Sequence, residues 1–124
     1  MTIIDANYIL RWFLNDVPEQ AVVAEKLLRD AGEGSVYISA VTLAEVTYVL
    51  RGKGYDHEQI VAIFDNLYYY GSVIAPTMVC GRAVELFRST NLDFEDCMLA
   101  AYHQVKGYDV ATFDTSLRKR LNQQ

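Results

Sequence analysis

Apolar residues recur along the chain in two patterns: short continuous runs, and longer stretches with a spacing of three or four positions. The short runs predict β-strands, whereas the longer stretches predict amphipathic helices. We expect strands at residues 2–5, 35–38, 71–75 and 109–113, and helices that begin at Ala6, Pro18, Ala40, His57, Pro76, Phe94 and Thr115. Strands that alternate with helices predict an α/β fold, in which a mostly parallel sheet is covered by helices on both faces.

The last third of the chain, residues 91–114, combines three of these expected features. Asp93 is expected to cap a helix, and Gly107 is expected to end it. Within that helix, Phe94, Met98, Ala101 and Val105 form a core-facing stripe at helical spacing. The β-prone run that follows ends in Asp114, which would place a carboxylate at the carboxyl end of a strand.

Other acidic residues fall at the same edge of the expected sheet. Asp5 ends the first strand, and Glu45 lies just inside a helix that follows a strand. Asp93 and Asp96 open the helix that precedes the last strand, which ends in Asp114. Because ligands of open parallel sheets bind at the carboxyl ends of the strands, we expect these acids to converge on one crevice.

Glu45 is unusual because the helix around it, residues 40–50, is apolar on nearly every side. Such a helix is expected to be buried, and no cation lies three or four positions from Glu45. A buried carboxylate without a partner is destabilising, so Glu45 should face a cation, a metal or a solvent-filled cleft. A salt bridge to Arg11 or Arg82 is the structural alternative.

Three or four converging carboxylates repel one another unless a divalent cation is bound. Ligands that are all oxygen, without a cluster of His or Cys, select a hard ion such as Mg²⁺ or Mn²⁺. The chemistry that such a site supports is phosphoryl transfer. His57 and His103 are expected to be surface or helix residues rather than catalysts.

Composition adds further bounds. The 124 residues, 52% of them hydrophobic, predict a single domain over residues 1–124. No apolar run is long enough for a membrane span, and no signal sequence is recognisable, so we expect a cytoplasmic protein. Cys80 and Cys97 are expected to be free thiols. The net charge of −5 opposes general attraction to nucleic acid, which would therefore need a local basic patch.

Four segments resemble the acidic motifs of PIN-domain ribonucleases, and most closely those of VapC toxins from toxin–antitoxin pairs. They are residues 5–7 (DAN), 39–45 (SAVTLAE), 93–96 (DFED) with the alanines at 100–101, and 112–114 (TFD). The resemblance implies a three-layer α/β/α sandwich with a mostly parallel sheet of four to five strands. It also implies RNA cleavage that depends on Mg²⁺ or Mn²⁺, a homodimer and a cognate antitoxin protein.

The resemblance assigns roles to individual residues. Asp5, Glu45 and Asp96 match the main metal-binding carboxylates, and Asp114 matches the fourth acid. Supporting positions are Asn7, beside the first acid, and Thr112, whose hydroxyl shapes the site. Many relatives carry a further acid two residues after the fourth, where this chain has Ser116; Asp93 is the candidate replacement.

Each assignment has a structural alternative. Asp5 and Asp114 would also serve as helix caps, and Asp93 with Asp96 resembles a capping box. Residues 68–70, three tyrosines, fit either a core or an exposed interface. Basic residues that could contact phosphates are Arg51 and Lys53, or Arg118, Lys119 and Arg120.

We therefore expect an endoribonuclease in which metal-activated water attacks the phosphodiester and leaves a 3′-hydroxyl and a 5′-phosphate. The rival interpretations are a PIN-like nuclease of RNA processing or DNA repair and a catalytically silent PIN binding module. A phosphoacceptor receiver domain is less compatible, because the chain lacks an early pair of acids and a Lys after the last strand.

Overall fold

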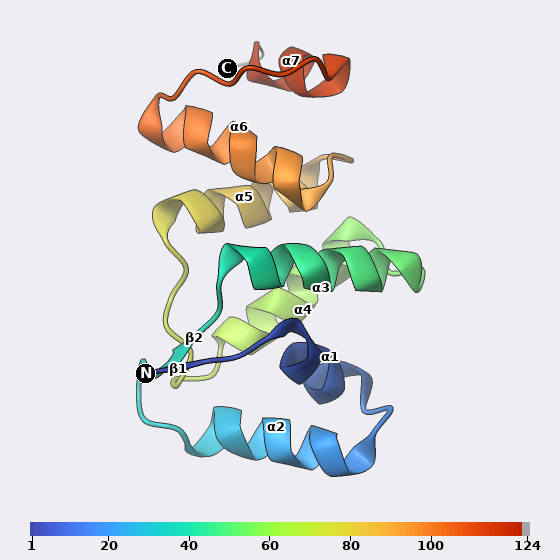
Figure 1. Ribbon diagram of the computed structural model, residues 1–124, viewed down its shortest axis with the longest axis vertical. Helices are drawn as coiled ribbons and strands as arrows, with labels where there is room; N and C mark the ends of the chain where they lie inside the picture. The colour runs from blue at the N-terminus through green and yellow to red at the C-terminus, as the bar shows by residue number, and fades with distance from the viewer. Residues whose placement is uncertain (123–124) are drawn as a thin grey trace. The chain divides into compact units, whose positions relative to one another are not determined.

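The chain folds into helices and one short parallel sheet, and the computed structural model describes residues 1–122 (Figure 1). Its contacts divide it into a first unit, Met1–Ala75, and a second unit that begins at Pro76. The first unit contains β1 (Thr2–Ile3), α1 (Ala6–Leu14), α2 (Pro18–Asp30), β2 (Val36–Tyr37), α3 (Ala40–Gly52) and α4 (His57–Tyr68). The second contains α5 (Met78–Ser89), α6 (Phe94–Lys106) and α7 (Thr115–Leu121). No helix within residues 1–122 has the length and apolar character to cross a membrane.

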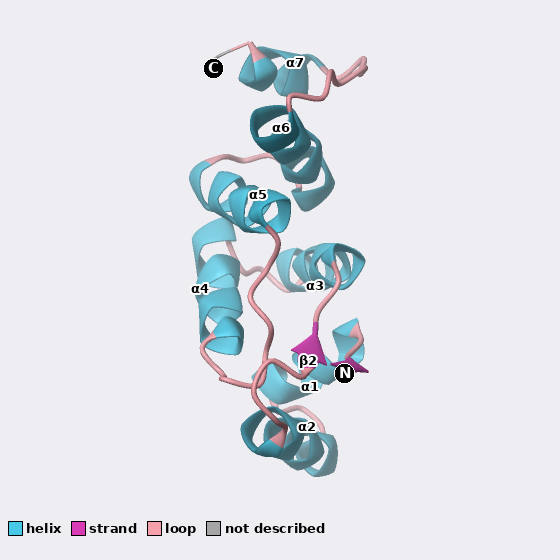
Figure 2. Ribbon diagram, turned by 90° about the vertical axis from the view of Figure 1, so that its left-hand side faces the viewer, coloured by secondary structure: helices cyan, strands magenta, loops and turns pink. Residues whose placement is uncertain are grey.

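The sheet of the described residues has two strands, shown in magenta in Figure 2. β1 pairs with β2 in parallel, with Thr2 opposite Val36 and Ile3 opposite Tyr37. A third segment begins to join them, since Val73 forms a parallel bridge with Val36. The expected strand at 71–75 is thus reduced to one bridge. The parallel α/β character is confirmed, whereas the sheet of four to five strands stays a prediction.

The core of the first unit lies where α1 packs on α2 and on α3. It is built from aliphatic side chains on one face of each helix and from Phe64 of α4. The fully buried members include Ile9, Ala24, Leu28, Leu43, Val46, Leu50, Ile60 and Leu67. The buried Ser72 ties the end of the unit to α2, because its hydroxyl donates to the carbonyl of Leu28 at 2.5 Å.

A polar cluster reinforces this core. Trp12 Nε1 donates to the hydroxyl of Tyr70 at 3.0 Å, and that hydroxyl donates to Glu25 of α2. The rings of Trp12 and Tyr70 also meet edge to face at 6.0 Å. Tyr69, in contrast, is 90% exposed. The tyrosine run is therefore divided, with Tyr70 in a structural contact and Tyr69 on the surface.

α3 differs from its expected burial. Leu43, Val46 and Leu50 are buried as expected, but Val41 and Tyr48 are 79% and 81% exposed. The helix therefore buries one face only. The apolar composition of α3 predicted burial on all sides. Composition alone does not specify which face packs against another element.

The second unit is held together by the packing of α5 on α6. Phe87 and Phe94 meet edge to face at 5.9 Å, and Cys97 and Ala101 are fully buried. Gly107 ends α6 in the left-handed conformation, with φ 72°, as its position predicted. α5 begins two residues after the expected Pro76, because Thr77 supplies the cap.

Residues 109–113 form no strand, contrary to the prediction, and Phe113 is 96% exposed. Backbone carbonyls next to this segment and within it contact side chains instead. His103 Nδ1 contacts the carbonyl of Tyr108 at 2.7 Å, and Arg118 Nε donates to the carbonyl of Thr112 at 2.8 Å. A strand requires a pairing partner, and β propensity alone does not supply one.

Candidate functional site

Asp5 lies where the chain leaves β1 and enters α1. Its carboxylate accepts a hydrogen bond from the backbone N–H of Tyr8 at 2.9 Å, which makes it the N-cap of the helix. Its side chain is exposed, and Asn7 lies exposed in the first turn behind it. Asp5 therefore caps α1, as the structural alternative predicted, and its exposed carboxylate is also accessible to a ligand.

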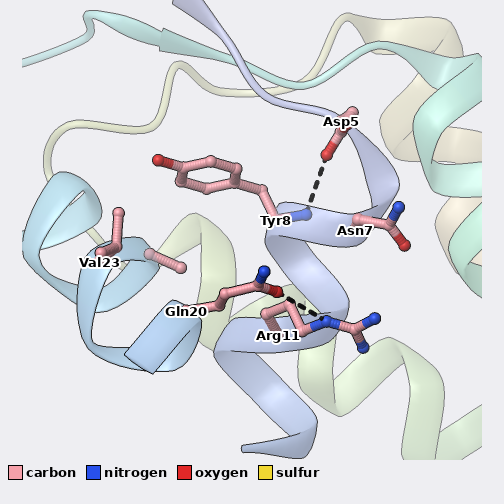
Figure 3. Close-up of a pocket in the computed structure, with 7 residues that line it drawn as sticks. Asp5, Asn7, Tyr8, Arg11, Gln20 and Val23 are labelled. Carbon is pink, nitrogen blue, oxygen red and sulfur yellow. Dashed lines mark hydrogen bonds between the residues drawn. The ribbon is translucent and has the colours of Figure 1, made fainter. Parts of the chain in front are cut away.

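A pocket of about 410 Å³ opens beside Asp5, within the first unit. Figure 3 shows its lining, which comes from Asp5 and from residues of α1 and α2. The lining residues are Asp5, Asn7, Tyr8, Arg11, Gln20, Val23 and Ala24. Neither Tyr8 nor Arg11 was among the predicted site residues, since Arg11 was considered only as a salt-bridge partner of Glu45. Their spacing in the sequence could have predicted that Tyr8 and Arg11 lie together, because residues three positions apart lie on one face of a helix.

Glu45 lies exposed in the middle of α3. Its expected burial is therefore wrong, and the same face of the helix carries the exposed Val41 and Tyr48. The two arginines considered as structural partners are engaged elsewhere: Arg11 pairs with Asp16 at 3.1 Å, and Arg82 hydrogen bonds with Gln104. Exposure leaves the carboxylate of Glu45 accessible to a cation.

The second unit brings three of the predicted acids into electrostatic contact. Asp93 caps α6 by accepting the backbone N–H of Asp96 at 3.0 Å, as the capping alternative predicted. Asp114 caps α7 by accepting the N–H of Leu117 at 2.8 Å. Partial burial raises the pKa of Asp96, and the negative charges of Asp93 and Asp114 raise it further. The two neighbouring carboxylates therefore destabilise the charged form of Asp96.

Thr112 positions the last of these acids. Its hydroxyl accepts the backbone N–H of Asp114 at 3.1 Å, and its carbonyl is held by Arg118. Arg118 and Lys119, with Thr115 and Ser116, also line a shallow surface pocket on α7. The structure thus places part of the basic run directly after the predicted fourth acid.

The donor chemistry fits a hard divalent cation, because every candidate ligand is a carboxylate. The geometry is less complete. Among residues 1–122, no group of three or more His, Cys, Asp or Glu side chains is arranged to hold a metal ion. The side chains thus match a hard cation in ligand type, and the gathering of Asp5, Glu45, Asp96 and Asp114 stays a prediction.

The remaining candidate nucleophiles are unsuited to chemistry. Burial raises the pKa of the Cys97 thiol to about 11, and burial also raises the pKa of Cys80. Both thiols are free, buried and protonated at neutral pH. His103 contacts the backbone of Tyr108 and so has a local structural role.

The fold and the candidate site define an α/β protein whose candidate functional groups are carboxylates, at the starts of α1, α6 and α7 and within α3. The model of the PIN domain matches residues 2–120, and the chain belongs to this family. PIN domains are generally nucleases, which supports a hydrolase activity. No curated protein and no solved structure matches the chain.

Proposed function

We propose that the protein is a metal-dependent endoribonuclease that acts as the toxin of a toxin–antitoxin pair. One observation carries the proposal: the PIN match spans residues 2–120, and acids stand at all four motif positions within it. These positions are Asp5, Glu45, Asp96 and Asp114. A chain that had lost catalysis would be expected to have lost some of them.

In this proposal, Asp5, Glu45 and Asp96 hold Mg²⁺ or Mn²⁺, and Asp114 orients the attacking water. When bound, the divalent ion neutralises phosphate charge and lowers the pKa of water. Because water rather than the ribose 2′-hydroxyl is the nucleophile, cleavage leaves a 3′-hydroxyl and a 5′-phosphate. Burial and then the negative charges of Asp93 and Asp114 raise the pKa of Asp96, and the repulsion among these charges supports a cation at this position, since a cation relieves it.

Three further residues have supporting roles in the proposal. The hydroxyl of Thr112 accepts a hydrogen bond from the backbone N–H of Asp114 and so positions this acid. The carboxylate of Asp93 accepts the backbone N–H of Asp96 and so holds the start of α6. Asn7 offers an exposed amide beside Asp5. Each contact is local in sequence, so it holds the acid in place without needing another part of the chain.

The proposal includes a three-layer sandwich with four to five mostly parallel strands. The parallel bridge between Val36 and Val73 supports it, because this bridge adds a third parallel segment beside β2.

The partners that we propose are RNA, a cognate antitoxin and a second copy of the chain, in the cytoplasm. Exposed apolar side chains support a protein partner, since they would be covered in a complex. They include Val41, Tyr48, Tyr69, Met78 and Phe113. Light scattering of the purified protein, alone and coexpressed with the neighbouring reading frame, tests both protein partners.

A silent PIN binding module is the second candidate. The family match supports it as well, because that match identifies the PIN domain rather than metal dependence. Such a module would bind nucleic acid or protein without cutting it.

The deciding experiment is cleavage of structured RNAs and matched DNAs with Mg²⁺ or Mn²⁺, with EDTA, and with Asp96→Asn. Asn keeps the shape of Asp and removes its charge, and the cap contact uses the backbone N–H of Asp96 rather than its side chain. Asp109→Asn, which removes an exposed acid from the same unit, is the control. We expect EDTA to abolish RNA cutting, Asp96→Asn to lower it about 100-fold, and the control to cut normally.

Other results separate the rivals. Preferential cutting of DNA would indicate a repair nuclease. RNA binding without cutting, in any metal, would establish the silent module. Cutting that persists unchanged in Asp96→Asn would show that the assigned site is wrong.

A further inference from the structure

The pocket beside Asp5 has a lining that identifies a ligand class. Its volume of about 410 Å³ falls in the range of small-molecule sites, and it lies within the first unit between α1 and α2. Tyr8, Val23 and Ala24 supply an aromatic and aliphatic wall, while Gln20 and Arg11 supply polar groups. A flat ring with polar edges matches this combination.

The charges of the pocket argue against a phosphate. Arg11 is already paired with Asp16, with Nη1 at 3.2 and 3.1 Å from the two carboxylate oxygens. The exposed carboxylate of Asp5 lies at the pocket and would repel an anion. A neutral ligand is therefore favoured inside the pocket.

Gln20 has a defined orientation. Arg11 Nε donates to Gln20 Oε1 at 3.1 Å, and a guanidinium can only donate, so the carbonyl end of the amide must face Arg11. The NH₂ group is left on the other side, and Figure 3 shows it turned away from Arg11. Gln20 therefore presents a hydrogen-bond donor, and Arg11 is the residue that positions it.

We infer that this pocket binds a nucleobase that carries an exocyclic carbonyl oxygen, such as uracil, by stacking on Tyr8 and by a hydrogen bond from Gln20. Aromatic stacking is available to every base, whereas the amide donor needs an acceptor that adenine lacks at its exocyclic position. The inference rests on the proposed function in one respect: it places the base next to Asp5, so the neighbouring phosphodiester would lie at the carboxylates.

The test uses the neutral nucleosides uridine and adenosine, so that neither metal nor cleavage is required. Binding is followed by amide NMR shifts of the wild-type protein. We expect uridine to shift Tyr8, Gln20 and Val23, and to bind about fivefold more tightly than adenosine, as one hydrogen bond would give.

Two neighbouring valines provide a matched pair of variants. Val23 lines the pocket and is 56% exposed, whereas Val22 is 67% exposed and lies outside the lining. Val23→Trp should fill the pocket and remove the uridine shifts, while Val22→Trp should leave them unchanged. Equal effects of the two variants would overturn the inference.

Gln20→Glu tests the hydrogen bond itself. The carboxylate keeps an acceptor for Arg11 but replaces the amide donor with a second acceptor. The preference for uridine should disappear or reverse toward adenosine. An unchanged preference, or an absence of nucleoside shifts at the pocket in the wild type, would overturn the inference.

The outcomes separate this inference from the proposed nuclease. RNA cleavage without nucleoside binding at the pocket would leave the nuclease standing and overturn the base site. Nucleoside binding with the expected variant effects, but without any RNA cleavage, would support the base site and overturn the nuclease.

Discussion

The two units carry acidic residues in different settings. In the first unit, Asp5 caps α1 at the edge of a pocket, and Glu45 stands exposed on α3. In the second unit, Asp93 and Asp114 act on Asp96 and raise its pKa, in addition to the effect of burial. The first unit therefore offers a shaped binding surface, and the second offers concentrated negative charge.

Under the proposed function, this difference would divide metal binding from ligand selection. Concentrated carboxylates are a costly arrangement unless a cation neutralises them, so the second unit is where metal binding should have its largest effect on stability. A pocket with stacking and hydrogen-bonding groups contributes to ligand specificity rather than to the chemical step. The predictions that follow test the setting of particular residues in each unit.

The largest expected effect contrasts two phenylalanines of the second unit. Phe94 is fully buried, and Phe94→Ala should lower the free energy of unfolding by about 3–5 kcal/mol. Phe113 is 96% exposed, and Phe113→Ala should change that free energy by about 0.5 kcal/mol or less. Urea denaturation measures both. A large loss in Phe113→Ala would show that residues 109–113 are packed, as the predicted strand requires.

A smaller effect contrasts two tyrosines of the first unit. Tyr70→Phe removes the hydroxyl that joins Trp12 to Glu25, and it should cost about 1–2 kcal/mol because both partners lose a hydrogen bond. Tyr69→Phe alters an exposed side chain and should be neutral. Thermal denaturation of the two variants gives the comparison. Equal stabilities would mean that the cluster does not hold the unit together.

The smallest expected effect concerns pH and the second unit. Because the pKa of Asp96 is raised, the native state holds this proton more tightly than the unfolded chain does. Stability should therefore fall as pH rises from the ordinary Asp value, about 3.9, through the raised one. Asp96→Asn cannot ionise, so it should be more stable than the wild type at neutral pH by up to about 0.5 kcal/mol.

The higher stability of Asp96→Asn should vanish at pH values below the ordinary Asp pKa, where the wild-type side chain is also neutral. Asp109→Asn serves as the control for net charge. If Asp96→Asn were less stable than the wild type at pH 7, attraction of the carboxylate to the start of α6 would outweigh the repulsion.

Features that depend on neighbouring residues were predictable from the sequence. The caps at Asp5, Asp93 and Asp114, and the helix end at Gly107, appear where local chemistry places them. These contacts join residues three or four positions apart, so the sequence contains both partners.

Features that depend on distant partners were predicted less well. The strand expected at 109–113 is not formed, and α3 has an exposed face, because neither pairing nor burial is encoded in the segment itself. The pocket beside Asp5 was missed for the same reason. Gln20 meets Arg11 only because α2 packs on α1, which no local pattern specifies.

The central claim is that carboxylates of this chain hold a divalent cation for RNA cleavage, and Mn²⁺ binding measured by electron paramagnetic resonance tests it most directly. Asp5→Asn, Asp96→Asn and the control Asp109→Asn should be compared with the wild type. The account predicts that the first two variants each lower Mn²⁺ affinity about tenfold or more, while the control binds like the wild type. Wild-type affinity in Asp5→Asn or in Asp96→Asn would contradict it.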